Sequence, residues 1–262
     1  MKNTGSFLAV LRKELAIYFA TPIFYTTGFF FLVLAGYFFY TNVLYYNVIS
    51  FQAAQQAANP QVAAQLTPNL MVFRPLFAVL AIVLLFLVPI LTMRLLAEEK
   101  RAGTAELLFT YPLTDWAIIL GKFAAALLIY AIFLGFTVVY ALAFSAVGRL
   151  DWGSLAAGYL GLLLLGGACL ALGLFASSLT ENQIIAAVSA FALLLLFWVI
   201  GWQQDIGAPG WGGFFGALSM MDHYDSFIRG VIDTRDLVYY LSFIYFFLFL
   251  TKRQLESRRW RA

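Results

Sequence analysis

The sequence has little charge. Only 11% of its 262 residues are charged, whereas 63% are hydrophobic. Soluble domains carry about 25% charged residues and about 45–50% apolar ones. A chain with so little polar surface cannot dissolve as a globular domain, so we expect an integral membrane protein. The small net charge of +3 does not indicate nucleic-acid binding, because membrane proteins concentrate Lys and Arg on their cytoplasmic side.

Residues that support metal and nucleotide chemistry are also scarce. The one cysteine, Cys169, lies in an apolar run and cannot form a disulfide or a cysteine metal site within one chain. The one histidine, His223, excludes a bis-histidine haem site and an HExxH zinc motif within one chain. No GxxxxGK followed by Ser or Thr occurs, so we do not expect this chain to hold nucleotide phosphates. We expect it to bind no cofactor and not to be an enzyme by itself.

Long runs without a charged residue mark the membrane spans, because each Asp, Lys or Arg at the bilayer centre costs roughly 2.5–3.5 kcal/mol on insertion scales. The pattern predicts an all-α polytopic membrane protein, a single domain over 1–262, with six spans. The last span is the weakest, because its apolar run from Leu237 to Thr251 reaches only about 22 Å as a helix. The expected spans are approximately 22–46, 75–97, 119–147, 152–176, 182–203 and 235–252.

The distribution of basic residues tests this topology. Six spans that start in the cytoplasm place both termini there, and the basic residues then divide 12 inside to 4 outside. This division satisfies the positive-inside rule. The first span has no small-residue cleavage site behind it, so we expect an uncleaved anchor. The inner set is Lys2, Arg12, Lys13, Arg94, Lys100, Arg101, Lys122, Lys252, Arg253, Arg258, Arg259 and Arg261, and the outer set is Arg74, Arg149, Arg229 and Arg235.

Two patterns in and near the spans predict helix packing. Apolar residues at steps of three and four predict an amphipathic interfacial helix over 5–20, and Pro22 favours a break before the first span over a simple extension of it. In the fourth span, Gly153, Ala157 and Gly161 recur every four residues. Small residues let helices approach closely in lipid, either within the subunit or against a second subunit.

The most informative stretch is the cytoplasmic loop 94–122, RLLAEEKRAGTAELLFTYPLTDWAIILGK. Its start can continue the second helix to Arg101, Gly103 can end that helix, and Thr104 can cap a new short helix that Pro112 stops. The result would be a stiff, charged projection that fits a groove in a partner protein. The alternative is a solvated elbow whose charges only keep it out of lipid.

Within this loop, EEKRAGTAELLFTYPLTD resembles the segment of ABC-2 type permeases in which a Glu-rich helix end, Gly-Thr and Glu-Leu-Leu precede a Thr-x-Pro. The segments GLFASSLTENQIIAAVSAF, 173–191, and HYDSFIRGVIDTRDLVYYLSFIYFFLFLTKRQLESRRW, 223–260, look like the gliding-motility-associated permease subunit, GldF type. The resemblance implies a six-span permease of the bacterial cytoplasmic membrane that exports a substrate. It also implies a re-entrant helical hairpin over 207–228, on the extracytoplasmic side.

The resemblance also implies partners. The permease would pair with a second permease subunit, in a homodimer or a heterodimer, above a dimer of cytoplasmic ABC ATPase subunits that bind ATP and Mg. The positions that match the coupling segment are Glu98, Glu99, Lys100, Arg101, Gly103, Thr104 and Glu106, with Arg12, Lys13 and Glu14 as a second contact.

Other functions stay open at this point. MDHYD and the residues after it, with Asp222, His223, Asp225 and Arg229, could contact a substrate or ion on the outer face, although a solvated helix start explains them as well. The chain could then be an extracytoplasmic membrane enzyme or assembly factor. It could also be a scaffold that couples an ABC ATPase to work on the envelope without transport. The many Phe and Tyr residues of the spans suit an amphipathic or lipid-like cargo, and the Gln- and Ala-rich loop 47–69 receives no role.

Overall fold

The computed structural model describes residues 2–55, 67–103, 114–146, 148–200 and 218–259, and every regular element in these ranges is helical. This confirms the all-α class for the described part of the chain. The elements are α1 Lys2–Ala20, α2 Pro22–Gln55, the short π-helix η1 Asn69–Phe73, α4 Arg74–Thr92, α5 Ala97–Arg101, α7 Asp115–Ser145, α8 Trp152–Leu179, α9 Gln183–Ile200, α11 Met220–Ile228 and α12 Thr234–Arg259.

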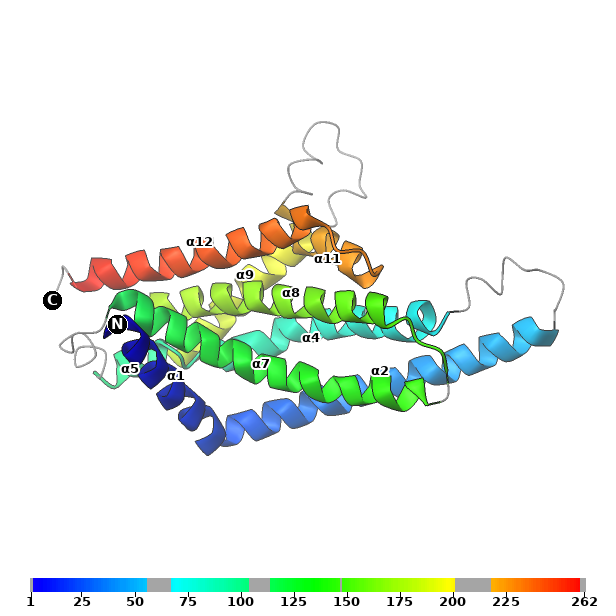
Figure 1. Ribbon diagram of the computed structural model, residues 1–262. Coiled ribbons are helices and arrows are strands. Elements are labelled where there is room, and N and C mark those ends of the chain that lie inside the picture. The colour runs from blue at the N-terminus through cyan, green and yellow to red at the C-terminus, as the bar shows by residue number, and fades with distance from the viewer. Residues whose placement is uncertain (1, 56–66, 104–113, 147, 201–217, 260–262) are drawn as a thin grey trace.

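Five segments are long and apolar enough to cross a membrane, and they coincide with the first five predicted spans. They are Pro22–Ala53, Asn69–Arg101, Asp115–Ser145, Trp152–Leu179 and Gln183–Ile200. The long helices run along a common direction, and both ends of the chain lie at one end of this bundle (Figure 1). We call this the terminal end. The link between α7 and α8 and the end of α2 lie at the opposite end.

Helix α8 forms the centre of the bundle, where it packs against α4, α7, α9, α11 and α12 (Figure 1). In its most apolar stretch 78% of the residues are buried within the chain, compared with 22% in α2 and 17% in α9. The exposed side chains of α2 and α9 are largely apolar. These two helices therefore offer surface to lipid, whereas α8 supplies the core.

Small residues let the neighbours of α8 approach closely. A Cβ atom on Gly158 would overlap the ring of Phe77, and one on Gly161 would overlap Phe227. Ala157 is also buried within the chain. Ala157 and Gly161 thus pack against other helices of the same chain, whereas Gly153 is exposed at the start of α8. Packing of these small residues against a second subunit stays a prediction.

Helix α1 is separate from the first span, as Pro22 predicts. It ends at Ala20, and α2 begins at Pro22 at an angle to it (Figure 1). Val10, Glu14 and Tyr18, spaced by four residues, are buried against the rest of the chain. Other apolar side chains of α1 are exposed, among them Leu8, Ile17 and Phe19. Whether this apolar surface lies in a membrane interface stays a prediction.

The sixth predicted span lies in α12, which has 26 residues and a length of about 39 Å. It packs along α8, but its last turns carry Lys252, Arg253 and Glu256, and it is not among the five segments above. A sixth crossing therefore stays a prediction. Of the predicted hairpin at 207–228, the structure describes only the part that contains α11, and 207–217 lies outside the described residues.

Candidate functional site

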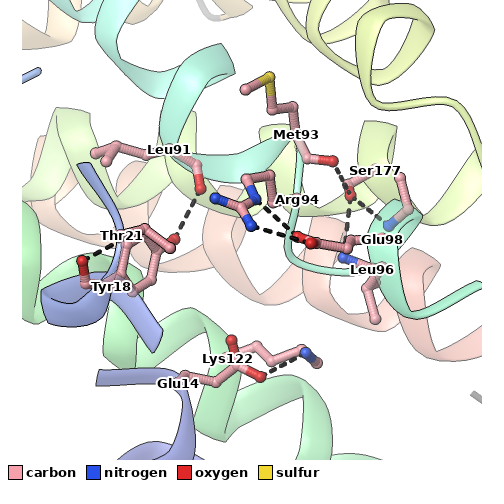
Figure 2. A network of polar contacts seen from close by, with 11 residues as sticks. Glu14, Tyr18, Thr21, Leu91, Met93, Arg94, Leu96, Glu98, Lys122 and Ser177 are labelled. Carbon is pink, nitrogen blue, oxygen red and sulfur yellow. Dashed lines mark hydrogen bonds and ion pairs between the residues drawn. The ribbon is translucent and has the colours of Figure 1, made fainter. Parts of the chain in front are cut away.

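Three segments that are far apart in the sequence meet at the terminal end: α1, α5 and the first turns of α7. Lys122 of α7 lies between them. Its Nζ atom is 2.7 Å from Glu14 Oε1 of α1 and 2.9 Å from Glu99 Oε2 of α5. Lys13 Nζ lies 2.9 Å from the other Glu99 oxygen, Oε1. We call Lys13, Glu14, Glu99 and Lys122 the ion-pair cluster, and Figure 2 shows its Glu14–Lys122 pair.

The cluster is unusual because its centre is buried. The side chain of Lys122 is 1% exposed and that of Glu14 is 7% exposed. Two ammonium groups and two carboxylates balance one another, which a buried charge requires. Partial burial acts to lower the pKa of Lys13, but the hydrogen bond to Glu99 and the attraction of the Glu99 and Glu14 carboxylates raise it further. The pKa of Lys13 is therefore above its ordinary value, and Lys13 stays charged at neutral pH.

A glycine next to Lys122 makes this approach possible. A Cβ atom on Gly121 would lie 2.8 Å from Val10 Cγ1 and 3.4 Å from the Leu11 backbone nitrogen of α1. Such distances are shorter than ordinary van der Waals contact, so only glycine lets α1 lie this close to α7. The close approach brings Glu14, one turn after Val10, to the Lys122 ammonium group.

Side chains from other helices hold the turn that precedes α5. Helix α4 stops at Thr92, and a turn at 93–96 interrupts the continuous helix that we predicted to reach Arg101. Ser177 of α8 accepts hydrogen bonds from the backbone N–H groups of Leu96 and Ala97, both at 3.1 Å, and donates to the Met93 carbonyl at 3.2 Å. One hydroxyl thus satisfies three backbone groups that the interrupted helix leaves without partners (Figure 2).

Helix α1 contributes a similar contact to the end of α4. The buried hydroxyl of Tyr18 donates a hydrogen bond of 2.7 Å to the Leu91 carbonyl, which lies in the last turn of α4 (Figure 2). Close by, Arg94 binds Glu98 through two hydrogen bonds of 2.7 and 2.9 Å. The ends of α1, α4 and α8 and the start of α7 therefore hold α5 in one position.

A cleft of about 340 Å³ opens between α1, α4 and α5, next to these contacts. One wall is apolar and the other carries charged groups of both signs. No group of three or more His, Cys, Asp or Glu side chains in the described ranges is arranged to hold a metal ion. The charged wall includes Lys13, Glu14, Arg94, Glu98, Glu99 and Lys122, and the apolar wall includes Ile17, Ile23, Ile90 and Leu91.

The residues predicted to couple to an ATPase thus fall into two sets. Half of them bind other parts of this chain: Glu14, Lys13 and Glu99 in the ion-pair cluster, Glu98 on Arg94, and Lys100 on the Ser178 carbonyl. Arg12 and Arg101 are exposed, and Gly103 ends α5 with a positive φ of 67°. Thr104 and Glu106 lie outside the described residues.

The residues predicted on the outer face gather at α11. Asp225 binds Arg229 at 2.5 Å and Arg74 at 3.3 Å. The imidazole of His223 lies 2.6 Å from Asp236 Oδ1 and stacks on Tyr239 with 4.0 Å between the ring centres. Asp222 follows the helix cap, because its N–H group donates to the Ser219 hydroxyl. These contacts tie α11 to α4 and α12, and a role of these residues in contacting a substrate or ion stays a prediction.

Comparison with known families decides the class. A profile described as "ABC-2 family transporter protein" matches residues 8–250. The chain belongs to the ABC-2 transporter family. The match covers most of α1, all five spans, the ion-pair cluster and most of α12, so the helical bundle as a whole is that of an ABC-2 transporter membrane protein. No curated protein matches the chain, and the match does not distinguish the gliding-motility-associated type within the ABC-2 family.

Three residues that hold the terminal end together, Lys122, Ser177 and Arg94, could not be identified from the sequence. Lys122 was counted only as an inner charge and as the end of the loop, although its position between IILG and FAAA marks a cation in a buried helix. Ser177 lies in the segment 173–191, which was used only for its resemblance to a permease subunit, and Arg94 was counted only as an inner charge and as the start of the loop 94–122. A serine at the end of a long apolar helix gives no signal of its partners, because they lie 80 to 84 positions away in the chain.

Proposed function

We propose that this chain is the permease subunit of an ABC-2 exporter and that its terminal end faces the cytoplasm, where it receives a separate ATPase. Family membership supports the permease role, and the concentration of basic residues at the terminal end supports the orientation. ATP and Mg would be bound by the ATPase partner, because this sequence has no phosphate-binding loop. The bacterial cytoplasmic membrane is the proposed location.

The observation that carries the coupling proposal is the ion-pair cluster. A partner that pushed on α5 would also push on α7 through Glu99 and Lys122, and on α1 through Glu14 and Lys13. Buried, compensated ion pairs are costly to break, so the three helices would move together. The exposed residues Arg12 and Arg101, with the loop 104–113, would then form the surface that the ATPase contacts.

Orientation is tested first, with single cysteines. Cys169 is buried, so an introduced cysteine is the main thiol that a membrane-impermeant maleimide can reach in intact cells. We expect Val231→Cys, which is 58% exposed near the opposite end, to react from outside. Arg101→Cys should react only after the membrane is permeabilised. Reaction of Arg101→Cys in intact cells would contradict the proposed topology, because it would place Arg101 outside the cell.

Coupling is tested by charge reversal at an exposed residue that the fold does not need. Arg101→Glu should reduce the amount of ATPase that copurifies with the chain and the ATP-dependent movement of cargo in proteoliposomes. Arg253→Glu is the matched control, because Arg253 is 65% exposed at the same end but lies on α12, outside the proposed contact. Equal copurification and transport in both variants and in the wild type would contradict the proposed contact at α5.

Three finer proposals remain. The permease pairs with a second permease subunit, like or unlike itself, and it belongs to the gliding-motility-associated type, because of the segments 173–191 and 223–260. The neighbouring reading frames test both statements.

A scaffold without transport is the second candidate function. It would keep ATPase copurification and ATP hydrolysis but would move no cargo in proteoliposomes.

A further inference from the structure

A pocket of about 290 Å³ lies at the opposite end of the bundle, between the start of α4, the link from α7 to α8 and the end of α11. Three arginines line it: Arg74, Arg149 and Arg229. The sequence places only four basic residues on this side of the membrane, and three of them are in this one pocket. The fourth, Arg235, is exposed and does not line the pocket. We call the three the arginine pocket.

Two carboxylates lie at or beside the pocket, and they do not balance these arginines: Asp151 lines the pocket, and Asp225 binds two of the arginines without lining it. One carboxylate, that of Asp225, serves two guanidinium groups, with Oδ1 3.3 Å from Arg74 and Oδ2 2.5 Å from Arg229. The other, that of Asp151, caps α8 by accepting the Gly153 N–H group at 3.0 Å. Within the described part of the chain, no acidic side chain lies within 4.0 Å of the Arg149 guanidinium.

Three positive charges therefore face two negative ones, and the charge of Arg149 is open to a ligand. Lys and Arg are costly on the outer side of a membrane protein by the positive-inside rule, so a concentration of them in one pocket favours a binding role over a solvated surface.

The pocket is held open by contacts between its walls. The side chain of Asn69 donates to the Asp151 carbonyl at 2.8 Å and accepts from the Asp151 N–H group at 3.2 Å, which joins η1 to the start of α8. Gly230, with a φ of 82°, turns the chain after α11 and brings it so close to Ser154 that a Cβ atom would overlap the serine hydroxyl. The arginines are thus presented by a preformed frame, and a ligand needs to order little of it.

The chemistry of the pocket selects a phosphate group. Guanidinium groups bind phosphate oxygens through paired hydrogen bonds, and several of them around one pocket suit a tetrahedral anion with several acceptors. The size of the pocket is at the lower limit of small-molecule sites, which fits a headgroup better than a large ligand. Leu70 and Ile228 add an apolar edge on the side of the helices. We propose that the arginine pocket binds the phosphate group of a lipid headgroup or of a soluble phosphate ester.

The test uses the purified full chain in a neutral detergent, titrated with phosphatidylglycerol and followed by native mass spectrometry. We expect saturable binding to the wild type. Arg149→Gln should weaken it about tenfold, the effect of losing one charge-assisted hydrogen bond of about 1.4 kcal/mol. Arg149 is exposed and binds no carboxylate in the described part of the chain, so this variant should fold normally. Thermal unfolding of the same sample would check this.

Arg235→Gln is the matched control, since it removes the fourth outer arginine without touching the pocket. Competition by millimolar inorganic phosphate would identify soluble phosphate esters as ligands, whereas binding that phosphate does not displace would identify the lipid headgroup. Equal affinities of the wild type, Arg149→Gln and Arg235→Gln for phosphatidylglycerol, with no binding of inorganic phosphate, would overturn the proposal. The outer position of the pocket rests on the orientation proposed above. None of these measurements involves the ATPase or the orientation, so their failure is distinguishable from a failure of the proposed function.

Discussion

Lys122→Met is the sharpest test of the ion-pair cluster. Methionine keeps the length and apolar stem of lysine but removes the ammonium group. Lys13, whose side chain is 50% exposed, would then be the one cation of the cluster beside Glu14 and Glu99, and the cluster would carry an excess negative charge near the core. Removing one partner of a buried ion pair costs about 3–5 kcal/mol. At about 2–4 °C for each kcal/mol, the scale of soluble proteins of this size, we expect Tm to fall by roughly 6–20 °C.

The chain supplies its own reporter for this measurement. Cys169 is its one cysteine and is 4% exposed in α8. A maleimide dye that fluoresces on reaction with a thiol therefore reports the opening of the core as a detergent sample is heated. Lys252→Met is the matched control, because its Nζ atom lies 2.9 Å from Glu256 in a pair on the surface of α12. Lys252 and Glu256 are 24% and 28% exposed and therefore much less buried than Lys122, so the control should shift Tm much less.

A double variant separates charge from packing. Adding Glu14→Gln to Lys122→Met restores a neutral cluster of Lys13 and Glu99, so the double variant should be more stable than the sum of the single effects by about 0.5–3 kcal/mol. The reasoning is refuted if Lys122→Met shifts Tm no more than Lys252→Met does. It is also refuted if the double variant shows strict additivity, because the residues would then not interact as a charged pair.

Two further predictions concern the same bundle and use the same assay. Ser177→Ala should lower Tm by several degrees, because it leaves buried backbone groups of the turn before α5 without partners, and the loss of these hydrogen bonds costs about 1–3 kcal/mol. Ser178→Ala should lower Tm less, since the Ser178 hydroxyl donates to a carbonyl of its own helix. Gly161→Ala should cost about 1–3 kcal/mol by overlap with Phe227, whereas Gly135→Ala meets nothing within 4 Å and should leave Tm unchanged or raise it.

Properties that depend on local composition could be predicted from the sequence. The first five spans were found from charge-free runs, since the cost of a charge in lipid is paid residue by residue and needs no knowledge of neighbours. The break before α2 followed from Pro22, and the end of α5 from Gly103, which adopts a φ of 67°. The same reasoning predicts a sixth span in α12 but with the weakest signal, because the charged last turns of that helix shorten its apolar run.

Properties that depend on tertiary contacts could not be predicted. The partners of Lys122 in the ion-pair cluster include Glu14, which is 108 positions away. Nothing in the local sequence of either residue specifies the other. The interruption of the helix after Thr92 was missed for the same reason, since Ser177 stabilises it from another helix. As a result, residues that the loop motif assigned to a partner, such as Glu99, form ion pairs within this chain.

The two ends of the bundle use charge in opposite ways, and this difference favours opposite roles for them. At the terminal end, the carboxylates of Glu14 and Glu99 are matched by ammonium groups and largely removed from water, so the ion-pair cluster is electrically neutral and joins three helices. At the opposite end, Asp225 is shared by two arginines, and Arg149 has no acidic partner among the described residues. A closed, neutral cluster can transmit a push between helices but gains nothing from a ligand, whereas an open pocket with excess positive charge gains free energy from an anion. Under the proposed function, the ion-pair cluster would transmit the push of the ATPase at one end of the bundle, and the arginine pocket would bind an anion at the other end.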